Sequence, residues 1–175
     1  MRLFAQLAAL ARRRLNPFFA RPVRALVVDV DGTLTDGGMY YGPQGEALKK
    51  FNTRDAKGML DVQALGIRIC IITAEDSPSV AARMRKLGFT EYHAGVKDKL
   101  PLLKKLAADW NTPLAEIAYI GDDLGDLECL QAAGVACCPA DAVPEVLAAS
   151  RYICTHKSGA GAVREVCDLI RAARR

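Results

Sequence analysis

Two aspartates, Asp29 and Asp31, stand two positions apart at the end of an apolar run at residues 25–28. A short run rich in Val and Leu is typical of a buried strand, and side chains alternate along a strand, so both carboxylates start on one face. Two carboxylates so placed repel each other unless a cation or a shared proton compensates their charge. Calcium in an EF-hand loop is excluded, because the twelfth position of that loop would be Tyr40 instead of an acid. The pair therefore predicts a metal site, although Asp-x-Asp-Gly is also common in plain turns.

Polar side chains also mark other points where strands end and helices begin. Thr73 follows an apolar run, Lys99 starts a leucine-rich helix, and Asp122 and Asp123 follow another apolar run, with Asp126 nearby. Each of these residues alone also fits a turn, a helix cap or a solvated helix start. In open α/β sheets, however, ligands bind beyond the carboxyl ends of the strands, where these side chains would converge.

This set of residue types suits phosphoryl transfer, which depends on positioning and charge neutralisation. One carboxylate can act as a nucleophile and form an aspartyl-phosphate, while a second protonates the leaving oxygen and then deprotonates water. Carboxylates and water suit Mg²⁺ as a hard cation, and a lysine and a hydroxyl can bind the remaining phosphoryl oxygens. The residues thus indicate a magnesium-dependent phosphoryl-transfer enzyme.

Strands and helices alternate along the chain, as its hydrophobic periodicity indicates. The predicted strands are residues 25–30, 67–73, 91–95, 117–120, 135–138 and 152–154. The predicted helices are residues 55–65, 77–87, 99–110, 125–133, a helix from Pro144, and residues 162–171. This alternation predicts an α/β fold with a doubly wound, mostly parallel sheet and helices on both faces.

One segment interrupts this alternation. Residues 39–41 and 47–51 flank a Gly-Pro turn at 42–45, which predicts a β-hairpin soon after the aspartate pair. A hairpin outside the parallel sheet leaves strand edges unpaired, and such edges favour a partner. The hairpin therefore predicts a homo-oligomer.

The length of 175 residues and the 51% apolar content fit one domain with a sizeable core. The net charge is +4, but residues 1–24 contain six Arg and no acidic residue, so the remaining body is mildly acidic. With 6% aromatic residues and no basic patch, nucleic-acid binding is not expected. We expect a basic extension over residues 1–21, able to form an amphipathic helix, and one catalytic domain over residues 22–175.

The sequence indicates a cytoplasmic protein without a membrane span. No apolar run approaches the length needed to cross a bilayer, and the N-terminal Arg cluster follows its apolar stretch, opposite to a secretory signal. Six Cys lie mostly within apolar patterns and form no C-x-x-C pair, so we expect reduced, buried thiols. The two histidines, His93 and His156, are far apart in the sequence, which gives no support for a zinc site.

The motifs DVDGT, IIT, a single Lys and GDD, in this order, resemble the four motifs of the haloacid dehalogenase (HAD) superfamily of phosphatases. The resemblance covers residues 24–172 and implies a Rossmann-like HAD fold for the domain over residues 22–175. It implies that Asp29 is the nucleophile and a Mg²⁺ ligand, and that Asp31 is the general acid and base and binds Mg²⁺ through its carbonyl oxygen. It further implies that Thr73 and Lys99 bind the phosphoryl group, that Asp122 completes the metal site, and that Asp123 and Asp126 support it.

Thr73 and Lys99 are separated by only 26 positions, which leaves no room for the cap domain that many HAD phosphatases carry. The segments TDGGMYY, KKFNTRDAKG, GDDLGD and KSGAGAVREVCDLI resemble the capless phosphatases of 3-deoxy-manno-octulosonate (KDO) 8-phosphate and its nine-carbon relatives. This resemblance implies a homotetramer whose hairpins pack at its centre and whose C-terminal tail reaches a neighbour's active site. The substrate-binding residues it implies are Asn52, Thr53, Arg54, Asp55, Glu75, Arg83, Lys157, Ser158 and Gly159.

Two positions depart from the pattern of the eight-carbon enzymes. Glu75 and Leu60 stand where those enzymes carry Arg, which leaves Arg83 as the candidate partner of the substrate carboxylate. The Thr-x-Glu pattern, together with FNT, looks more like phosphatases of 2-keto-3-deoxynononic acid (KDN) 9-phosphate. The sequence therefore favours KDN 9-phosphate as substrate over KDO 8-phosphate.

Two other functional classes stay open. A non-catalytic oligomerisation or regulatory module of sugar-nucleotide synthesis, associated with acylneuraminate cytidylyltransferases, is opposed by the intact motif set. A response-regulator-like receiver would carry its phosphorylated Asp after a later strand and would lack the DxDG loop. Release of phosphate, instead of stable phosphorylation of the protein, would distinguish a phosphatase from a receiver.

Overall fold

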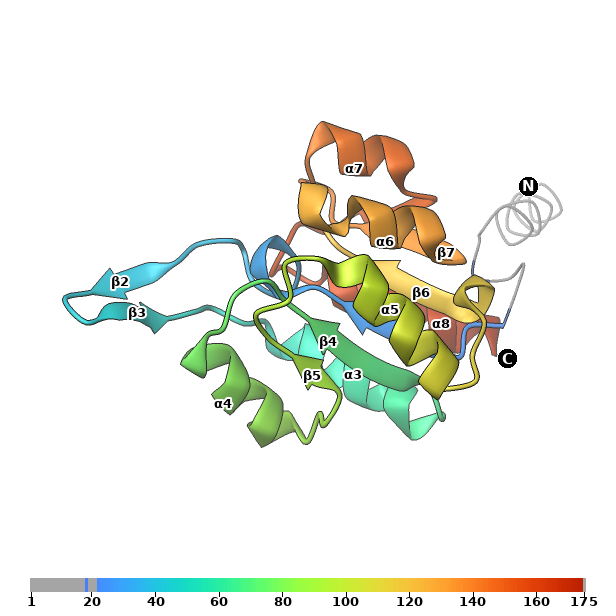
Figure 1. Cartoon of the computed structure of the whole chain (residues 1–175), viewed down its shortest axis with the longest axis horizontal. Helices are drawn as coiled ribbons and strands as arrows, with labels where there is room; N and C mark the ends of the chain where they lie inside the picture. Colours follow the sequence, from blue (N-terminus) through green and yellow to red (C-terminus); the bar gives the residue numbers. More distant parts are fainter. Residues whose placement is uncertain (1–17, 19–21, 175) are drawn as a thin grey trace, which may run out of the picture.

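The computed structural model describes residue 18 and residues 22–174, and its centre is a six-stranded sheet (Figure 1). All neighbouring strands pair in parallel, in the order β5-β4-β1-β6-β7-β8. The strands are β1 (Ala25–Val28), β4 (Arg68–Ile72), β5 (Tyr92–His93), β6 (Ile117–Ile120), β7 (Val135–Cys138) and β8 (Tyr152–Ile153). The predicted doubly wound parallel sheet is confirmed, and its strand order reverses between β1 and β6.

Helices cover both faces of this sheet (Figure 1). One core layer lies under α3 (Thr53–Ala64), α4 (Pro78–Leu87) and α8 (Ala162–Ala173). The other lies under α5 (Lys99–Asp109), α6 (Leu127–Ala132) and α7 (Pro144–Ala149). Alternate residues of β1 enter the two layers, Leu26 the first and Val27 the second. Because both faces are covered, a central strand is apolar throughout, which explains the uninterrupted run at 25–28.

The carboxyl end of β1 lies between the ends of β4 and β6. Val28 is in register with Ile71 of β4 and with Ile120 of β6. The N–H of Asp29 continues this ladder by donating to the carbonyl of Ile120 at 3.0 Å. The chain then folds into a π-type turn (Val30–Leu34), so the strand ends two residues earlier than predicted. Ligands in doubly wound sheets bind at this switch between neighbouring strands.

The predicted hairpin is present and projects from the body of the molecule (Figure 1). Its strands are β2 (Tyr40–Gly42) and β3 (Gly45–Leu48), paired antiparallel. The second strand begins earlier than the predicted residue 47, and Phe51 instead forms an isolated bridge with Thr35 at the base of the hairpin. The base is therefore tied to the turn that follows Asp29.

The element boundaries follow local capping chemistry. Asn52 begins α3 by accepting a hydrogen bond from the N–H of Arg54 at 2.9 Å. Ser77 caps α4, with Pro78 in the first turn, and Gly88 ends α4 in the left-handed conformation at φ +75°. The predicted strand at 91–95 shortens to the two residues of β5.

Phe18 lies within the predicted N-terminal extension but belongs to the hydrophobic core. Its ring meets that of Tyr152 edge-on, with centroids 5.8 Å apart. The extension therefore contacts the domain at this residue, whereas the predicted amphipathic helix lies outside the described residues. Among the helices of the described part, none combines the length and apolar character that crossing a bilayer requires.

Candidate active site

A buried ion pair joins the first residue after β1 to the first residue of α5. Lys99 Nζ donates to Asp29 Oδ1 at 2.6 Å and to Asp126 Oδ1 at 2.7 Å. All three side chains are almost inaccessible to solvent. The predicted convergence of element ends is therefore observed for these three residues.

Asp122, which follows β6, completes a cluster of three carboxylates. Oxygen atoms of Asp29, Asp122 and Asp126 all lie within 4.8 Å of one another. Thr33 Oγ1 donates to Asp122 Oδ1 at 2.9 Å. A Cβ atom on Gly32 would lie 2.0 Å from Asp122 Oδ2, and Gly32 has φ +83°, so the DVDG motif needs glycine here for both space and conformation.

The electrostatics of this cluster favour a bound cation. Burial and the negative charge of Asp126 hold the pKa of Asp29 well above its ordinary value, against the opposing effect of Lys99. Burial, with the charges of Asp126 and Asp123, raises the pKa of Asp122 to about 6 despite the Thr33 hydrogen bond. Lys99 is the ammonium group that pairs with the buried Asp29 and Asp126, and the half-buried Asp122 adds a third carboxylate, so a divalent cation would balance the remaining charge. The donors are all oxygen atoms, which suits Mg²⁺ better than softer metals.

The two residues predicted to support the metal site differ in what they contact. Asp126 lies inside the cluster, where Tyr119 donates its hydroxyl proton to Asp126 Oδ1 at 2.6 Å and the N–H of Asp122 donates to Oδ2 at 3.2 Å. Asp123 instead accepts a hydrogen bond from the N–H of Leu124 at 2.7 Å and caps the turn that follows. Because Lys99 and the N–H of Asp123 also donate to Asp126, both of its oxygens are engaged, which suits a supporting role in the cluster, whereas Asp123 shapes the loop.

Asp31 has a partner that the sequence interpretation missed. Lys49 Nζ lies 2.5 Å from Asp31 Oδ1 and 3.4 Å from Glu46 Oε2, and the Lys49 side chain is 0% exposed. Burial alone would lower the pKa of Lys49, but its contacts with Asp31 and Glu46 raise it, so the group stays cationic. Asp31 Oδ2 is buried without a hydrogen-bond partner among the described residues. The signal was present, since Lys49 belongs to the KKFNTRD segment.

The hairpin also contacts the site through Glu46. Glu46 Oε1 accepts a hydrogen bond from Ser77 Oγ at 2.5 Å, so β3 is joined to the cap of α4.

Thr73 is buried directly after β4, and its Oγ1 accepts a hydrogen bond from the N–H of Glu75 at 3.3 Å. Glu75 itself is exposed beyond the strand end. Thr73 is therefore placed at the same sheet edge as Asp29.

The predicted substrate-binding residues at 52–55 do not all face the crevice. Asn52 Nδ2 donates to the carbonyl of Gly159 at 3.4 Å, which brings the start of α3 to the C-terminal loop. Asp55 is buried, and its Oδ1 accepts a hydrogen bond from the N–H of Arg164 at 2.7 Å in the first turn of α8. Asp55 therefore caps α8 through Oδ1, while its Oδ2 is buried without a hydrogen-bond partner among the described residues. Thr53 and Arg54 are exposed.

Arg83 and the C-terminal loop also have contacts within the chain. The guanidinium group of Arg83 lies 5.9 Å from the centre of the Phe51 ring. The N–H of Gly159 donates to the carbonyl of Thr33 at 3.1 Å, and Ser158 donates to Asp141 Oδ1 from both N–H and hydroxyl. A Cβ atom on Gly159 would lie 2.6 Å from the backbone nitrogen of Asp36, so glycine permits this close contact. Gly159 thus packs on the turn after β1 of its own chain and Ser158 is tied to Asp141, while the approach of this loop to a neighbour's active site stays a prediction.

Comparison with known proteins agrees with this geometry. The family of haloacid dehalogenase-like hydrolases matches residues 90–166. The 3-deoxy-D-manno-octulosonate 8-phosphate phosphatase of Yersinia pestis is 41% identical over 151 residues, which cover 86% of this chain and 81% of that protein. The chain belongs to the haloacid dehalogenase-like phosphatases.

Solved structures of such phosphatases share the fold of most of this chain. The Yersinia pestis octulosonate phosphatase structure superposes with a TM-score of 0.87 at 38% identity and covers 93% of this phosphatase and 86% of that chain. The enzyme of Moraxella catarrhalis, in complex with a magnesium ion, a phosphate ion and KDO, gives a TM-score of 0.86 at 36% identity, over 93% of this chain and 92% of that one. The predicted membership of a capless HAD phosphatase family is confirmed.

Proposed function

We propose that this phosphatase is a Mg²⁺-dependent phosphomonoester hydrolase that acts on a phosphorylated 2-keto-3-deoxy sugar acid, with KDO 8-phosphate as the first candidate. The observation that carries the proposal is the buried Asp29–Lys99 pair within the three-carboxylate cluster. Octulosonate 8-phosphate phosphatases at 37–41% identity support the substrate class. A non-catalytic module would have no need of this buried, mutually repelling arrangement.

Hydrolysis would proceed in two displacements at phosphorus. One carboxylate oxygen of Asp29 attacks phosphorus and forms the aspartyl-phosphate, while the P–O bond to the sugar breaks and Asp31 gives its proton to the leaving oxygen. Asp31 then takes a proton from water, whose oxygen attacks phosphorus and restores Asp29 and inorganic phosphate. Lys99 and Thr73 would bind phosphoryl oxygens. Mg²⁺, when bound, would be held by Asp29, Asp122 and the carbonyl of Asp31, with Asp126 supporting the site, and would neutralise the charge of the carboxylates and the phosphoryl group.

A second candidate substrate is KDN 9-phosphate, which Glu75 favours. Glu75 is exposed two residues after Thr73, where an acid would repel the substrate carboxylate but accept hydrogen bonds from hydroxyl groups. A longer sugar acid carries one more carbon with its hydroxyl. Arg83, Arg54 and Lys157 remain the proposed cationic partners of the substrate.

Steady-state kinetics on the two substrates would test these proposals. We expect Mg²⁺-dependent release of phosphate from KDO 8-phosphate with a higher kcat/KM than from KDN 9-phosphate, and the reverse order would make the nine-carbon acid the substrate. Asp29→Asn should lower kcat by about 1,000-fold or more, because the nucleophile is lost. Retained activity in this variant, or stable phosphorylation of the wild-type protein without phosphate release, would overturn the proposed phosphatase mechanism.

Three broader assignments are also proposed. The protein would act in the cytoplasm as a homotetramer, with the exposed hairpin at its centre. Support comes from Tyr41 and Leu48, which are 71% and 65% exposed at the hairpin surface. The six cysteines are all free and buried, as expected for a reducing compartment. Residues 1–21 would form the basic extension and residues 22–175 the catalytic domain.

A further inference from the structure

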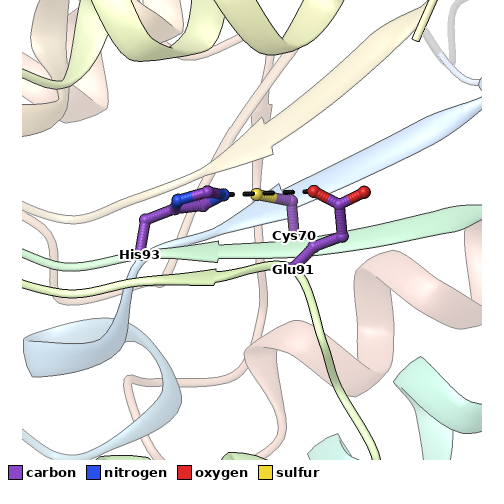
Figure 2. A group of neighbouring side chains, drawn as sticks. All are labelled: Cys70, Glu91 and His93. Carbon is purple, nitrogen blue, oxygen red and sulfur yellow. Dashed lines mark ion pairs between the residues drawn. The ribbon is translucent and has the colours of Figure 1, made fainter. Parts of the chain in front are cut away.

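Strands β4 and β5 bring together three side chains that are distant in the sequence. Ile71 of β4 is in register with Tyr92 of β5, and the N–H of Ile71 donates to the carbonyl of Glu91 at 2.9 Å. Because side chains alternate along strands, Cys70, Glu91 and His93 share the opposite face from Ile71 and Tyr92. Figure 2 shows the His93 ring and the Glu91 carboxylate pointing toward each other, together with the Cys70 side chain.

The donor atoms of these three residues converge. One atom from each, the Cys70 sulfur, a Glu91 oxygen and a His93 ring nitrogen, lies within 4.8 Å of the other two. His93 Nε2 is 4.0 Å from Glu91 Oε2. That ring nitrogen is buried and has no hydrogen-bond partner in the described part of the chain. An unpaired buried nitrogen costs free energy, so a ligand at this point would satisfy it.

Neighbouring side chains orient the Glu91 carboxylate. Glu91 Oε1 accepts hydrogen bonds from Arg68 at 3.0 Å and from the indole N–H of Trp110 at 3.3 Å. The Arg68 guanidinium group lies 5.3 Å from the centre of the Trp110 ring, which restrains both donors. These hydrogen bonds engage Oε1 of Glu91, while Oε2 of the same carboxylate faces His93 and Cys70. Metal-binding carboxylates are commonly held in this way by outer hydrogen bonds.

We propose that Cys70, Glu91 and His93 bind Zn²⁺, with water in the fourth position, at a site separate from the three-carboxylate cluster. Sulfur, imidazole nitrogen and carboxylate oxygen form a donor set typical of zinc, whereas the active-site donors are all oxygen. A thiolate and a carboxylate balance the charge of the ion. Donors bound tetrahedrally at about 2.0–2.3 Å lie about 3.5 Å apart, so the half-buried Glu91 and His93 need move only slightly.

Zinc binding at this site would displace the thiol proton of Cys70. The bond formed is zinc–sulfur, the bond broken is S–H, and the proton passes to solvent. Burial raises the pKa of the Cys70 thiol, so the proton remains on sulfur until the ion binds. The ion would fix the two-residue strand β5 to β4. The N–H of Val96, just beyond β5, donates to the carbonyl of Thr73 at 3.0 Å, so this anchoring lies close to the active-site loops.

Cobalt spectroscopy under reducing conditions would test the proposed zinc site. The metal-stripped full chain is titrated with Co²⁺ in excess Mg²⁺, in an Asp122→Asn background that disables the carboxylate site. We expect one Co²⁺ per chain, a thiolate-to-cobalt charge-transfer band, and loss of that band when Zn²⁺ displaces Co²⁺. The band reports sulfur ligation, which an all-oxygen site cannot produce.

Matched variants separate coordination from folding. Cys70→Ser should abolish the band, whereas Cys154→Ser, a change at another buried free cysteine, should leave it unchanged. His93→Gln changes a half-buried side chain, so it tests the site even if Cys70→Ser fails to fold, and we expect its Zn²⁺ affinity to fall about 100-fold. Trp110→Phe should weaken binding about tenfold by releasing Glu91. Absence of the band in the parent, or its persistence at full strength in His93→Gln, would overturn the proposal without bearing on phosphatase activity.

Discussion

Asp29 and Asp31 have the same residue type and nearly the same position, but their partners differ. Asp29 is paired with Lys99 inside the carboxylate cluster, and Asp31 is paired with Lys49 at the base of the hairpin. The Asp29 carboxylate therefore lies within the carboxylate cluster, which suits the nucleophile and metal ligand proposed for it. The Asp31 carboxylate lies outside this cluster. This position suits the proposed acid and base, because a carboxylate oxygen that binds the metal cannot also carry the proton. Lys49 thus helps to divide the two roles.

Lys49→Met should lower kcat of the phosphatase by about tenfold or more with a smaller change in KM, because Asp31 and Glu46 would lose their shared cation and Asp31 would lose its fixed position. Steady-state kinetics across pH would measure this effect. Lys50→Met is the matched control, since the Lys50 side chain is 61% exposed and pairs with Asp36. Equal losses in the two variants would show that the Lys49–Asp31 contact has no role in turnover.

The raised pKa of Asp122 predicts how Mg²⁺ stabilisation depends on pH. Between its ordinary value of 3.8 and about 6, the folded metal-free protein binds more protons at Asp122 than the unfolded chain does. Its stability therefore falls as pH rises through this window. Above this pH window Asp122 is ionised, and bound Mg²⁺ would compensate its negative charge. Mg²⁺ should therefore raise Tm more at about pH 7.5 than at about pH 5. Thermal melts with Mg²⁺ or chelator test this, and Asp122→Asn should remove most of the difference; a larger Mg²⁺ effect at the lower pH would contradict it.

At the scale of elements, the contact between α3 and α8 holds the C-terminal loop against the turn after β1. Asp55 of α3 caps α8, and Asn52 at the start of α3 donates to the carbonyl of Gly159. Gly159 in turn donates to the carbonyl of Thr33, whose hydroxyl binds Asp122. The position of Asp122, a proposed metal ligand, thus depends on the packing of α3 against α8.

Asp55→Ala should lower the free energy of unfolding by about 2 kcal/mol, because the first turn of α8 would lose its side-chain acceptor. Denaturant unfolding at neutral pH would measure it. Asp61→Ala is the control on the same helix, since Asp61 is more exposed and pairs only locally with Lys57. If Asp55 bound substrate directly, its replacement would instead raise KM strongly while leaving stability unchanged.

Much of this arrangement could be predicted from the sequence, because strand ends carry the chemistry. The apolar run at 25–28 identifies the central strand, and Asp29, Lys99 and Asp122 follow from their positions at element ends. Contacts made by side chains across elements could not be predicted in the same way. The Lys49–Asp31 pair depends on the path of the hairpin base, and the Cys70–Glu91–His93 group depends on the β4–β5 register. The Gly159 contact likewise depends on a close approach of two backbones.

At the scale of the whole molecule, the hairpin leaves an apolar surface in solvent. Met39, Tyr40, Tyr41 and Leu48 are all exposed on β2, β3 or the residue before β2. The same hairpin carries Glu46 within β3, and Lys49 directly after β3 pairs with both Glu46 and Asp31. Assembly through the hairpin surface would therefore restrain the position of Lys49 beside Asp31, which couples the proposed oligomer to the proposed proton transfer.

Replacing Tyr41 and Leu48 together by Glu should dissociate the proposed tetramer, because like charges would meet where apolar side chains pack. Analytical ultracentrifugation would measure the mass, and Leu65→Glu serves as the control because Leu65 is an exposed apolar residue on another part of the surface. We expect kcat of the double variant to fall together with its mass, since a free hairpin holds Lys49 less firmly. A wild-type monomer, or a double variant that keeps its assembly, would show that the hairpin is not the interface. A dissociated variant with unchanged kcat would separate assembly from catalysis.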